Sequence, residues 1–280
     1  MNVGIIGLGL IGGSLALDLK KRGVAFNVFG LDRSLENQKI AKELGLVSEC
    51  LSLKDIIQKS DLLILAIPVH NAQSMIKDIL DDIPDRTYVM DMGSTKAGIC
   101  QVVKDHPKRN NFIACHPMAG TEYTGPKAAI HGLFDQKPVI ICDKEDTGHL
   151  ALEKAQQVFQ ALNMRILYMD AKDHDTHAAY VSHISHVSSF TLALSVLDKE
   201  QSEKAIFDLA SGGFESTARL AKSSAEMWSQ IFVQNKHSLL EVLDVYSYWL
   251  RKFRIAIEND DIQALSSLIK EANQIKKVLQ

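Results

Sequence analysis

The chain has 280 residues, of which 46 % are hydrophobic and 23 % are charged, a composition typical of a globular protein with room for two domains. Its formal net charge of −3 at pH 7 gives no overall attraction to nucleic acid or to an anionic membrane, so an anionic small molecule would have to be bound by local charge. No apolar run approaches the length of a membrane span, and Met1 leads directly into a predicted strand, so we expect a cytoplasmic protein without a targeting peptide. The four cysteines form no C-x-x-C pair, and we expect them to be reduced, buried thiols: Cys50, Cys100, Cys115 and Cys142.

The N-terminal segment has the pattern of a strand–turn–helix–strand unit. An apolar strand over residues 3–6 leads into three glycines with G-x-G-x-x-G spacing, Gly7, Gly9 and Gly12. In such a turn the first glycine permits a tight bend, the second lets the backbone approach a pyrophosphate, and the third lets the helix lie close to the strand. The following helix, over 11–22, directs its N-terminal amides at the diphosphate, whose negative charge the helix dipole favours. The pattern therefore predicts a dinucleotide site.

The acidic residue Asp32 ends the second strand, over 24–31, 20 residues after Gly12. A carboxylate at this place can accept hydrogen bonds from both ribose hydroxyls, which predicts NAD. Arg33 follows directly and can pair with the 2′-phosphate of NADP, but Asp32 would repel that phosphate, so NAD is the preferred prediction. The residues assigned to the cofactor are Gly7, Gly9, Leu10, Ile11, Gly12, Asp32, Arg33, Pro68 and Val69.

The alternation of strands and helices continues to Met169. Ser34 is the expected N-cap of a helix that Gly45 ends, and Pro68 ends an apolar strand over 61–67. Pro68 and Val69 then face the nicotinamide, and His70 starts the next helix. Further strands are expected over 87–92, 111–115, 138–142 and 165–169, with helices over 71–80, up to 104, and over 147–162. This order predicts an α/β fold, a Rossmann-like, doubly wound, mostly parallel sheet.

No convincing strand follows Asp170, and the apolar residues recur at helical spacing. Helices are expected over 170–197, 202–210, 225–259 and 261–279, with Gly212 and Gly213 breaking the pattern. We therefore expect a dinucleotide-binding domain over 1–169 and an all-α domain for substrate binding and dimerisation over 170–280. The long helices carry more apolar surface than one small bundle hides, which indicates a homodimer.

Two polar motifs follow strands of the sheet, at the edge where open α/β sheets bind ligands. His116 lies just past a strand, and an imidazole there can take a hydroxyl proton near neutral pH. Ser94, in the run Gly93–Lys96, can either cap the next helix or hydrogen-bond a reactive histidine. Both roles stay open from the sequence alone.

A third constellation lies in the helical half, where His183 and His186 share one helix face. His174 and His177 lie upstream, which raises the question of a metal site. Nine residues turn an α-helix by about 900°, so His174 and His183 face opposite sides, as do His177 and His186, and we expect no metal. Arg219 follows a glycine-rich run and can clamp a carboxylate with two hydrogen bonds.

These motifs together resemble the prephenate/arogenate dehydrogenases of tyrosine biosynthesis, over nearly the whole chain. The resemblance rests on five motifs in family order: GLGLIGGSLA from Gly7, DMGSTK from Asp91, HPMAGTE from His116, SHISH from Ser182 and GGFESTAR from Gly212. It implies an NAD-dependent oxidative decarboxylation that makes the substrate ring aromatic. It also implies that His116 accepts the proton of the ring hydroxyl, that Ser94 orients this contact, that Arg219 binds a substrate carboxylate and that His186 orients the substrate, with a less defined role for His183.

The resemblance also bears on which substrate is used. Many relatives carry Asp three residues before the clamping arginine, where this chain has Ser216, and in the family that acid goes with the ammonium group of arogenate. Ser216 therefore favours prephenate, although Glu215 can supply a carboxylate from the next position, so arogenate dehydrogenase is the alternative. With no mutase or regulatory segment recognised, we expect a monofunctional enzyme, on which tyrosine feedback at the active site is possible.

Two other classes of protein share part of this pattern. A β-hydroxyacid dehydrogenase pairs a similar nucleotide domain with helices but uses a lysine in a K-x-x-x-N signature, which is not clear here. A non-catalytic NAD-sensing protein would keep the nucleotide pocket and lose the chemistry, whereas Ser94, His116 and Arg219 are all present. Both alternatives predict no turnover of prephenate or arogenate.

Overall fold

The computed structural model describes residues 1–202 and 206–278 of the chain. By its internal contacts the chain divides into two compact units, residues 1–235 and 236–280. The expected division at 169/170 is therefore not the boundary between the compact units, and it stays a prediction about function.

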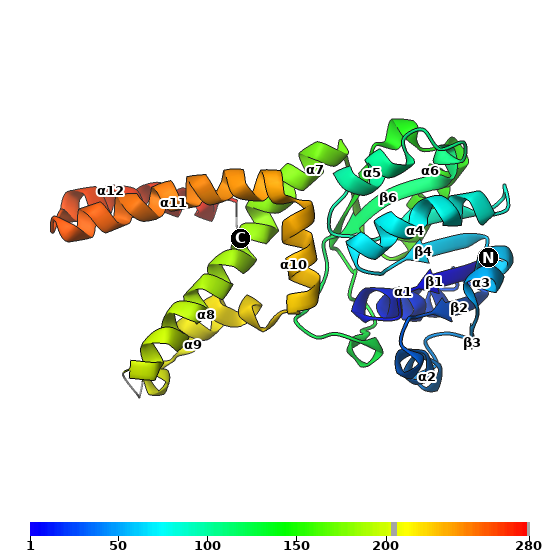
Figure 1. The fold of residues 1–280 in the computed structure, drawn as a ribbon, viewed down its shortest axis with the longest axis horizontal. Helices are drawn as coiled ribbons and strands as arrows, with labels where there is room; N and C mark the ends of the chain where they lie inside the picture. Colours follow the sequence, from blue (N-terminus) through cyan, green and yellow to red (C-terminus); the bar gives the residue numbers. More distant parts are fainter. Residues whose placement is uncertain (203–205, 279–280) are drawn as a thin grey trace. The chain divides into compact units, whose positions relative to one another are not determined.

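An eight-stranded sheet forms the centre of the first unit (Figure 1), in the order β3-β2-β1-β4-β5-β6-β7-β8. Every neighbouring pair is parallel except β6 and β7. The strands are β1 (Asn2–Ile6), β2 (Asn27–Leu31), β3 (Glu49–Cys50), β4 (Leu62–Leu65), β5 (Tyr88–Asp91), β6 (Phe112–Pro117), β7 (Pro138–Cys142) and β8 (Arg165–Met169). The mostly parallel sheet expected from the sequence is confirmed.

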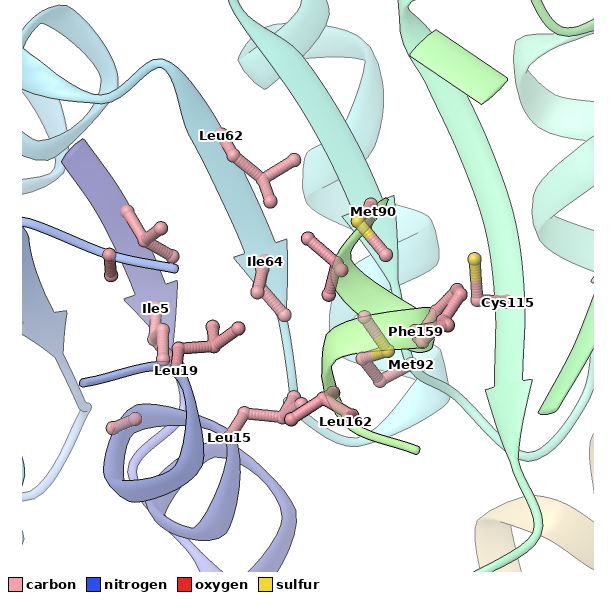
Figure 2. Packing of buried hydrophobic residues seen from close by; sticks show 14 of the residues in the cluster. Ile5, Leu15, Leu19, Leu62, Ile64, Met90, Met92, Cys115, Phe159 and Leu162 are labelled. Carbon is pink, nitrogen blue, oxygen red and sulfur yellow. The ribbon is translucent and has the colours of Figure 1, made fainter. Parts of the chain in front are cut away.

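Helices cover both faces of this sheet, so it is doubly wound. They are α1 (Leu10–Lys21), α2 (Leu35–Glu43), α3 (Leu53–Lys59), α4 (Val69–Asp82), α5 (Ala97–Val103) and α6 (His149–Ala161). On one face Leu15 and Leu19 of α1 and Phe159 of α6 join one buried cluster with alternate strand residues such as Ile5 and Ile64 (Figure 2). The other face buries the intervening strand residues against α3, α4 and α5. The alternation follows from the period of two along a strand.

Strand order reverses at β1, and this places the cofactor residues. The chain passes from β1 outward through β2 to β3 and then returns to β4 on the other side of β1. The carboxyl ends of β1 and β4 flank the crevice where open α/β sheets bind ligands. Gly7 follows β1 and Pro68 follows β4, so the sheet itself brings the two predicted cofactor segments together.

Local signals account for several helix boundaries. The Ser34 hydroxyl accepts the amide of Asn37 at 3.2 Å, which confirms it as the N-cap of α2. His70 is exposed in the first turn of α4, as expected. β3 and α3 were not anticipated, although Ser52 caps α3 by accepting the amide of Asp55. Of the cysteines, Cys50 is half-buried and the other three are buried, and burial raises the pKa of each thiol.

The helical part of the first unit departs from the expected helices. The helix expected over 170–197 is three consecutive segments: α7 (Ala171–Ala178), a π-helical turn (Ala179–His183) and α8 (Ile184–Ser202). Part of the short helix expected over 202–210 lies outside the described residues, and a 3₁₀ turn spans Phe207–Leu209. Gly212 and Gly213 do not break a helix but begin α9 (Gly212–Ala218), which a 3₁₀ turn (Arg219–Lys222) and α10 (Ala225–Gln234) follow.

The second unit consists of α11 (Lys236–Glu258), α12 (Ile262–Ala272) and a 3₁₀ turn (Asn273–Lys277). The single helix expected over 225–259 is wrong, because the helix ends at Asn235, whose side chain is held by the first unit. The end of the helix expected over 261–279 lies outside the described residues. No helix within the described ranges combines the length and the apolar character that a membrane crossing needs.

Candidate active site

The glycine-rich turn after β1 fits a dinucleotide. Gly7 has φ +96°, in the region that favours glycine, and its amide donates to Leu31 O at 2.7 Å. A Cβ on Gly12 would lie 1.9 Å from Gly7 O, so only glycine lets α1 approach the strand this closely. A Cβ on Gly9 would meet no atom within 4 Å, which leaves open space beside the backbone. Leu10 and Ile11 form the first turn of α1, half-buried, where helix amides can meet a diphosphate.

Asp32 lies beside this turn. One carboxylate oxygen accepts the amide of Leu8 at 2.8 Å and the other accepts the amide of Ser34 at 2.9 Å, which fixes the side chain at the end of β2. Arg33 is 75 % exposed and forms an ion pair with Glu226 at 2.8 Å, and this contact raises the pKa of Arg33. The arginine that could bind a 2′-phosphate thus forms an ion pair with a residue of α10, and the selection of NAD by Asp32 stays a prediction from the sequence.

Pro68 and Val69 begin α4 at the carboxyl end of β4. Val69 is buried and packs in a small cluster with Trp228 and Ile231 of α10. This edge of the sheet is therefore covered by α10, which brings the helical segment over the predicted nicotinamide side.

His116 lies in β6, 9 % exposed, at the same edge of the sheet. Its Nδ1 is 2.8 Å from Nε2 of His174 in α7. Burial lowers the pKa of His116 well below its usual value, and the neighbouring His174, Lys96 and His183 lower it further. A neutral imidazole is the form that can accept a proton, so this environment suits a general base.

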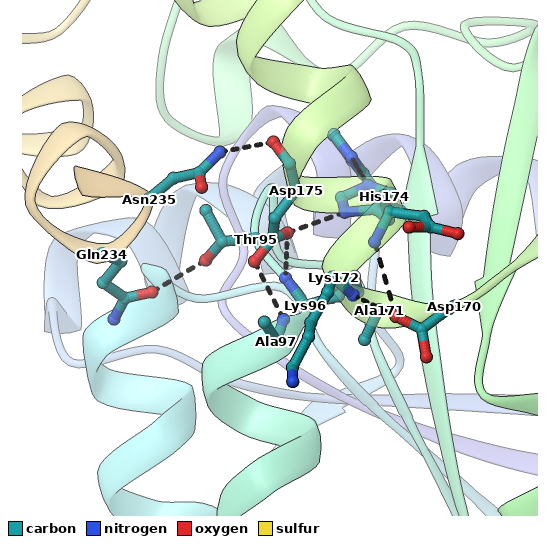
Figure 3. A network of polar contacts seen from close by, with 12 residues as sticks. Thr95, Lys96, Ala97, Asp170, Ala171, Lys172, His174, Asp175, Gln234 and Asn235 are labelled. Carbon is teal, nitrogen blue, oxygen red and sulfur yellow. Dashed lines mark hydrogen bonds and ion pairs between the residues drawn. The ribbon is translucent and has the colours of Figure 1, made fainter. Parts of the chain in front are cut away.

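Behind His174 lies Asp175, which joins three segments (Figure 3). His174 Nδ1 is 2.8 Å from Asp175 Oδ1. The same carboxylate accepts the amides of Lys96 at 2.7 Å and Ala97 at 2.9 Å, so it caps α5 from α7. Asn235 donates to the backbone carbonyl of Asp175 at 2.6 Å. The network holds α5, α7 and the end of α10 in one arrangement.

A buried lysine supports the strand that carries His116. Lys96 is fully buried, pairs with Asp91 and donates to the carbonyl of Cys115 at 2.8 Å. Burial alone would lower the pKa of Lys96, but the attraction of Asp91 outweighs it and the pKa is raised. Through its bond to the carbonyl of Cys115, Lys96 fixes the backbone next to His116.

Ser94 does not cap the next helix, which corrects one of its two expected roles. α5 begins three residues later, and Asp175 supplies its cap. Within the described part of the chain the Ser94 hydroxyl has no hydrogen bond, and His174 is the group in contact with His116. Ser94 lies half-buried just after β5, where it stays a candidate for contact with a ligand.

His183 and His186 converge on Trp228. His186 stacks on the indole with ring centroids 3.4 Å apart, and His183 meets it edge-on at 5.9 Å. Burial lowers the pKa of His183 to about 4 and also lowers the pKa of His186. His186 Nδ1 donates to Ser182 O at 3.1 Å, and His183 Nδ1 lies 3.1 Å from the Asn235 amide.

The estimate that nine residues turn the helix by about 900° assumes a regular α-helix between His174 and His183. Residues Ala179–His183 instead form a π-helical turn, whose hydrogen bonds span five residues, so the estimate does not apply to this pair. Asn235 donates to the carbonyl of Asp175 and contacts His183, which ties the two ends of this segment to the end of α10. Even so, the described residues contain no group of three or more His, Cys, Asp or Glu side chains arranged to hold a metal ion.

Arg219 follows α9 with a side chain that is 52 % exposed, and its Nη1 lies 3.6 Å from Glu122. Glu122 belongs to the segment after His116, so this ion pair brings Arg219 to the His116 side of the site. Ser216 is exposed, and its hydroxyl donates to Gly213 O at 3.0 Å. The structure thus gathers His116, His183, His186 and Arg219 around one region.

Sequence reasoning missed several residues of this region: His174, Asp175, Asn235, Glu122 and Trp228. His174 was considered only as a metal ligand. Its adjacent Asp175 was a usable signal, because an acid beside a histidine often fixes which ring nitrogen carries the proton. Nothing in the local sequence indicated Asn235 or Trp228.

Comparisons with known proteins identify the family of the chain. Residues 15–168 match the model "Prephenate dehydrogenase, nucleotide-binding domain", and residues 170–271 match "Prephenate dehydrogenase, dimerization domain". A prephenate dehydrogenase of Lactococcus lactis is 29 % identical over 279 residues, covering 99 % of this chain and 77 % of that protein.

Two solved structures are similar over the full length. The prephenate dehydrogenase of A. aeolicus in complex with hydroxyphenyl propionate and NAD+ has a TM-score of 0.89 and 26 % identity, covering 100 % of this chain and 98 % of the other. Synechocystis arogenate dehydrogenase has a TM-score of 0.77 and 27 % identity, covering both chains completely. The chain belongs to the prephenate dehydrogenase family.

Proposed function

We propose that the chain catalyses the NAD-dependent oxidative decarboxylation of prephenate to 4-hydroxyphenylpyruvate in tyrosine biosynthesis. The observation that carries the proposal is His116, a buried neutral imidazole at the same sheet edge as the glycine-rich turn. Membership of the family and the relatives named above support the reaction and the cofactor. A β-hydroxyacid dehydrogenase would need a lysine base, whereas Lys96 is fully buried in an ion pair with Asp91.

The nucleotide would be held by the glycine turn, the first turn of α1, and Asp32, with Pro68 and Val69 beside the nicotinamide. NAD, when bound, supplies the hydride acceptor. His116 Nε2 accepts the proton of the ring hydroxyl, since His116 Nδ1 is already occupied by His174. Ser94 orients the hydroxyl contact from the end of β5. Aromatisation makes the step strongly downhill, so the protein mainly positions the reactants and removes one proton.

Arg219 binds a carboxylate of the substrate, which replaces Glu122 as its anionic partner. His186, fixed by its stack on Trp228, orients the substrate, and His183 supports it from the same helix. His116, Ser94 and Arg219 come from three separate segments, so the site is assembled only when the helical segment packs on the sheet.

Ser216 supports prephenate over arogenate, because its hydroxyl offers no charge to an ammonium group. Glu215 lies four residues before Arg219 in the sequence, and Glu122 forms an ion pair with Arg219. The carboxylate of either residue can bind the ammonium group of arogenate. Arogenate dehydrogenase therefore stays the second candidate, and a Synechocystis relative carries that name.

The dimerization-domain match supports a homodimer, in which residues 1–169 bind the nucleotide and residues 170–280 bind substrate and dimerise. Tyrosine as a feedback inhibitor at the active site and a cytoplasmic location stay predictions from the sequence. Light scattering at micromolar concentration tests the dimer, and titration of the activity with tyrosine tests the inhibition.

The experiment that tests the function follows NADH formation by purified protein with NAD and either prephenate or arogenate. We expect turnover of prephenate, with a lower kcat/KM for arogenate. Turnover of arogenate alone would contradict the role given to Ser216. Tight NAD binding with no turnover of either substrate would favour a non-catalytic NAD-sensing protein.

A further inference from the structure

The proposed base and the two buried side chains behind it form a line. His116 Nδ1 is 2.8 Å from His174 Nε2, and His174 Nδ1 is 2.8 Å from Asp175 Oδ1. His174 is 2 % exposed and Asp175 is 5 % exposed, so both are removed from bulk water. His116 and His174 meet edge-on, with ring centroids 5.0 Å apart. Such a line has a definite order of donors and acceptors.

The order follows from Asp175. Its two carboxylate oxygens accept the amides of Lys96 and Ala97, which can only donate, so Asp175 is present as an acceptor. His174 Nδ1 must then carry a proton and donate it to Asp175. In a neutral His174 the other nitrogen, Nε2, is an acceptor, so His116 Nδ1 must carry a proton and donate to it. His116 Nε2 is left with its lone pair.

We propose that His174 and Asp175 are positioning residues that fix His116 as the Nδ1–H tautomer and take up the proton released by the substrate. This inference rests on the proposed function, in which His116 Nε2 removes the hydroxyl proton. When Nε2 gains that proton, the Nδ1 proton of His116 moves to His174 Nε2. His116 is neutral again, and the positive charge lies on His174 against the carboxylate of Asp175. One proton enters the line and none is lost from it.

The surroundings explain why the charge would move away from His116. Lys96, His174 and His183 are the neighbouring groups that lower the pKa of His116, and burial removes the solvent that would stabilise an imidazolium. The charge of Lys96 is balanced by Asp91 in its own pair. Asp175 is the carboxylate that lies next to His174, and Asn235 fixes its backbone. A positive charge is therefore better placed on His174 than on His116.

The tautomers can be read directly by NMR of the full-length protein labelled with ¹⁵N-histidine, without any substrate. We expect the signals of His116 and His174, when both rings are neutral, to be those of Nδ1–H tautomers. The His116 signal is assigned by its loss in His116→Asn. In Asp175→Asn the amide oxygen is expected at the place of Oδ1, because the Lys96 amide and His174 Nδ1 both donate there. We therefore expect both tautomers to be kept, while the negative charge that would stabilise a charged His174 is lost. An Nε2–H tautomer of His116 in the unmodified protein would overturn the proposal.

Kinetic measurements distinguish this proton relay, from His116 to His174, from a purely structural role of His174. Leu in His174→Leu has no acceptor for His116, whereas the amide oxygen in His174→Gln can accept the Nδ1–H but cannot take up the proton. We expect kcat to fall about 100-fold or more in His174→Leu and about 10-fold in His174→Gln, with the KM for prephenate and NAD changed by less than about 3-fold. The His116 tautomer should be kept in His174→Gln.

The same helix offers matched controls at exposed positions. His177→Gln and Asp173→Asn make identical chemical changes on α7, and both residues are exposed. They should leave kcat and the His116 signal unchanged. Equal activity of His174→Gln, His174→Leu and the unmodified protein would refute the relay. If the tautomers are as expected but prephenate is not turned over, the line stands and the proposed function is wrong.

Discussion

The close approach of α1 to β1 makes a prediction that separates folding from cofactor binding. A Cβ in Gly12→Ala would lie 1.9 Å from the carbonyl oxygen of Gly7, and real Cβ contacts are essentially never below 3.0 Å. Both atoms are on or next to backbone, so α1 must move by about 1 Å relative to the turn, away from a fully packed face. Overpacking of this kind costs about 3 kcal/mol, the upper part of its usual range.

Gly9→Ala is the matched change three residues earlier. Gly9 has φ −75°, which alanine adopts without strain, and its Cβ would meet nothing within 4 Å. The methyl group would instead occupy space that the cofactor's diphosphate needs. We expect unchanged stability but NAD affinity reduced about 10-fold or more, which corresponds to about 1.4 kcal/mol.

The assay is thermal unfolding without ligand, combined with calorimetric titration of NAD. A loss of about 3 kcal/mol lowers the Tm by roughly 6–12 °C in a protein of this size class. We expect that shift in Gly12→Ala and a shift within about 1 °C in Gly9→Ala. If Gly12→Ala kept the Tm of the unmodified protein, or Gly9→Ala bound NAD normally, the reading of the turn would be refuted.

Three further predictions concern the site. Because burial lowers the pKa of His116, kcat/KM should fall on the acid side with an apparent pKa below 6.5, and an apparent pKa above 6.5 would argue against a buried base. Below pH 6.5 the unfolded state should bind more protons than the folded state, so the free energy of unfolding should decrease as the pH drops. Lys96→Met leaves Asp91 buried without its partner and should lower the free energy of unfolding in urea by about 3–5 kcal/mol. An unchanged free energy of unfolding would show that the pair does not stabilise the fold. Ser216→Asp should raise kcat/KM for arogenate relative to prephenate in the NADH assay, and an unchanged ratio would remove this position from substrate choice.

Features set by neighbouring residues were predictable. The glycine spacing, the acid at the end of β2, and the Ser34 cap depend on contacts a few residues apart, and all lie where the sequence places them. The apolar runs of the central strands are equally local, because strands such as β4 and β6 are buried on both faces. These signals are sufficient for the Rossmann-like sheet and its ligand-binding edge.

Features set by distant contacts were not predictable. His116 and His174 are 58 residues apart and Lys96 and Asp175 are 79 apart, so no periodicity links them. The π-helical turn over Ala179–His183 keeps the apolar pattern of a helix, so the sequence pattern does not reveal it. The end of α10 at Asn235 also depends on a distant contact, because the Asn235 side chain donates to the carbonyl of Asp175.

The central claim is that a neutral His116 removes a proton while prephenate is oxidised with NAD. The most direct measurement is kcat for prephenate, followed as NADH absorbance, in the unmodified protein and in His116→Asn, with circular dichroism and NAD titration on both. We expect kcat to fall by about 10²–10⁴-fold in the variant while its fold and NAD affinity are retained. A variant that turns over prephenate within about 3-fold of the unmodified protein would contradict the account.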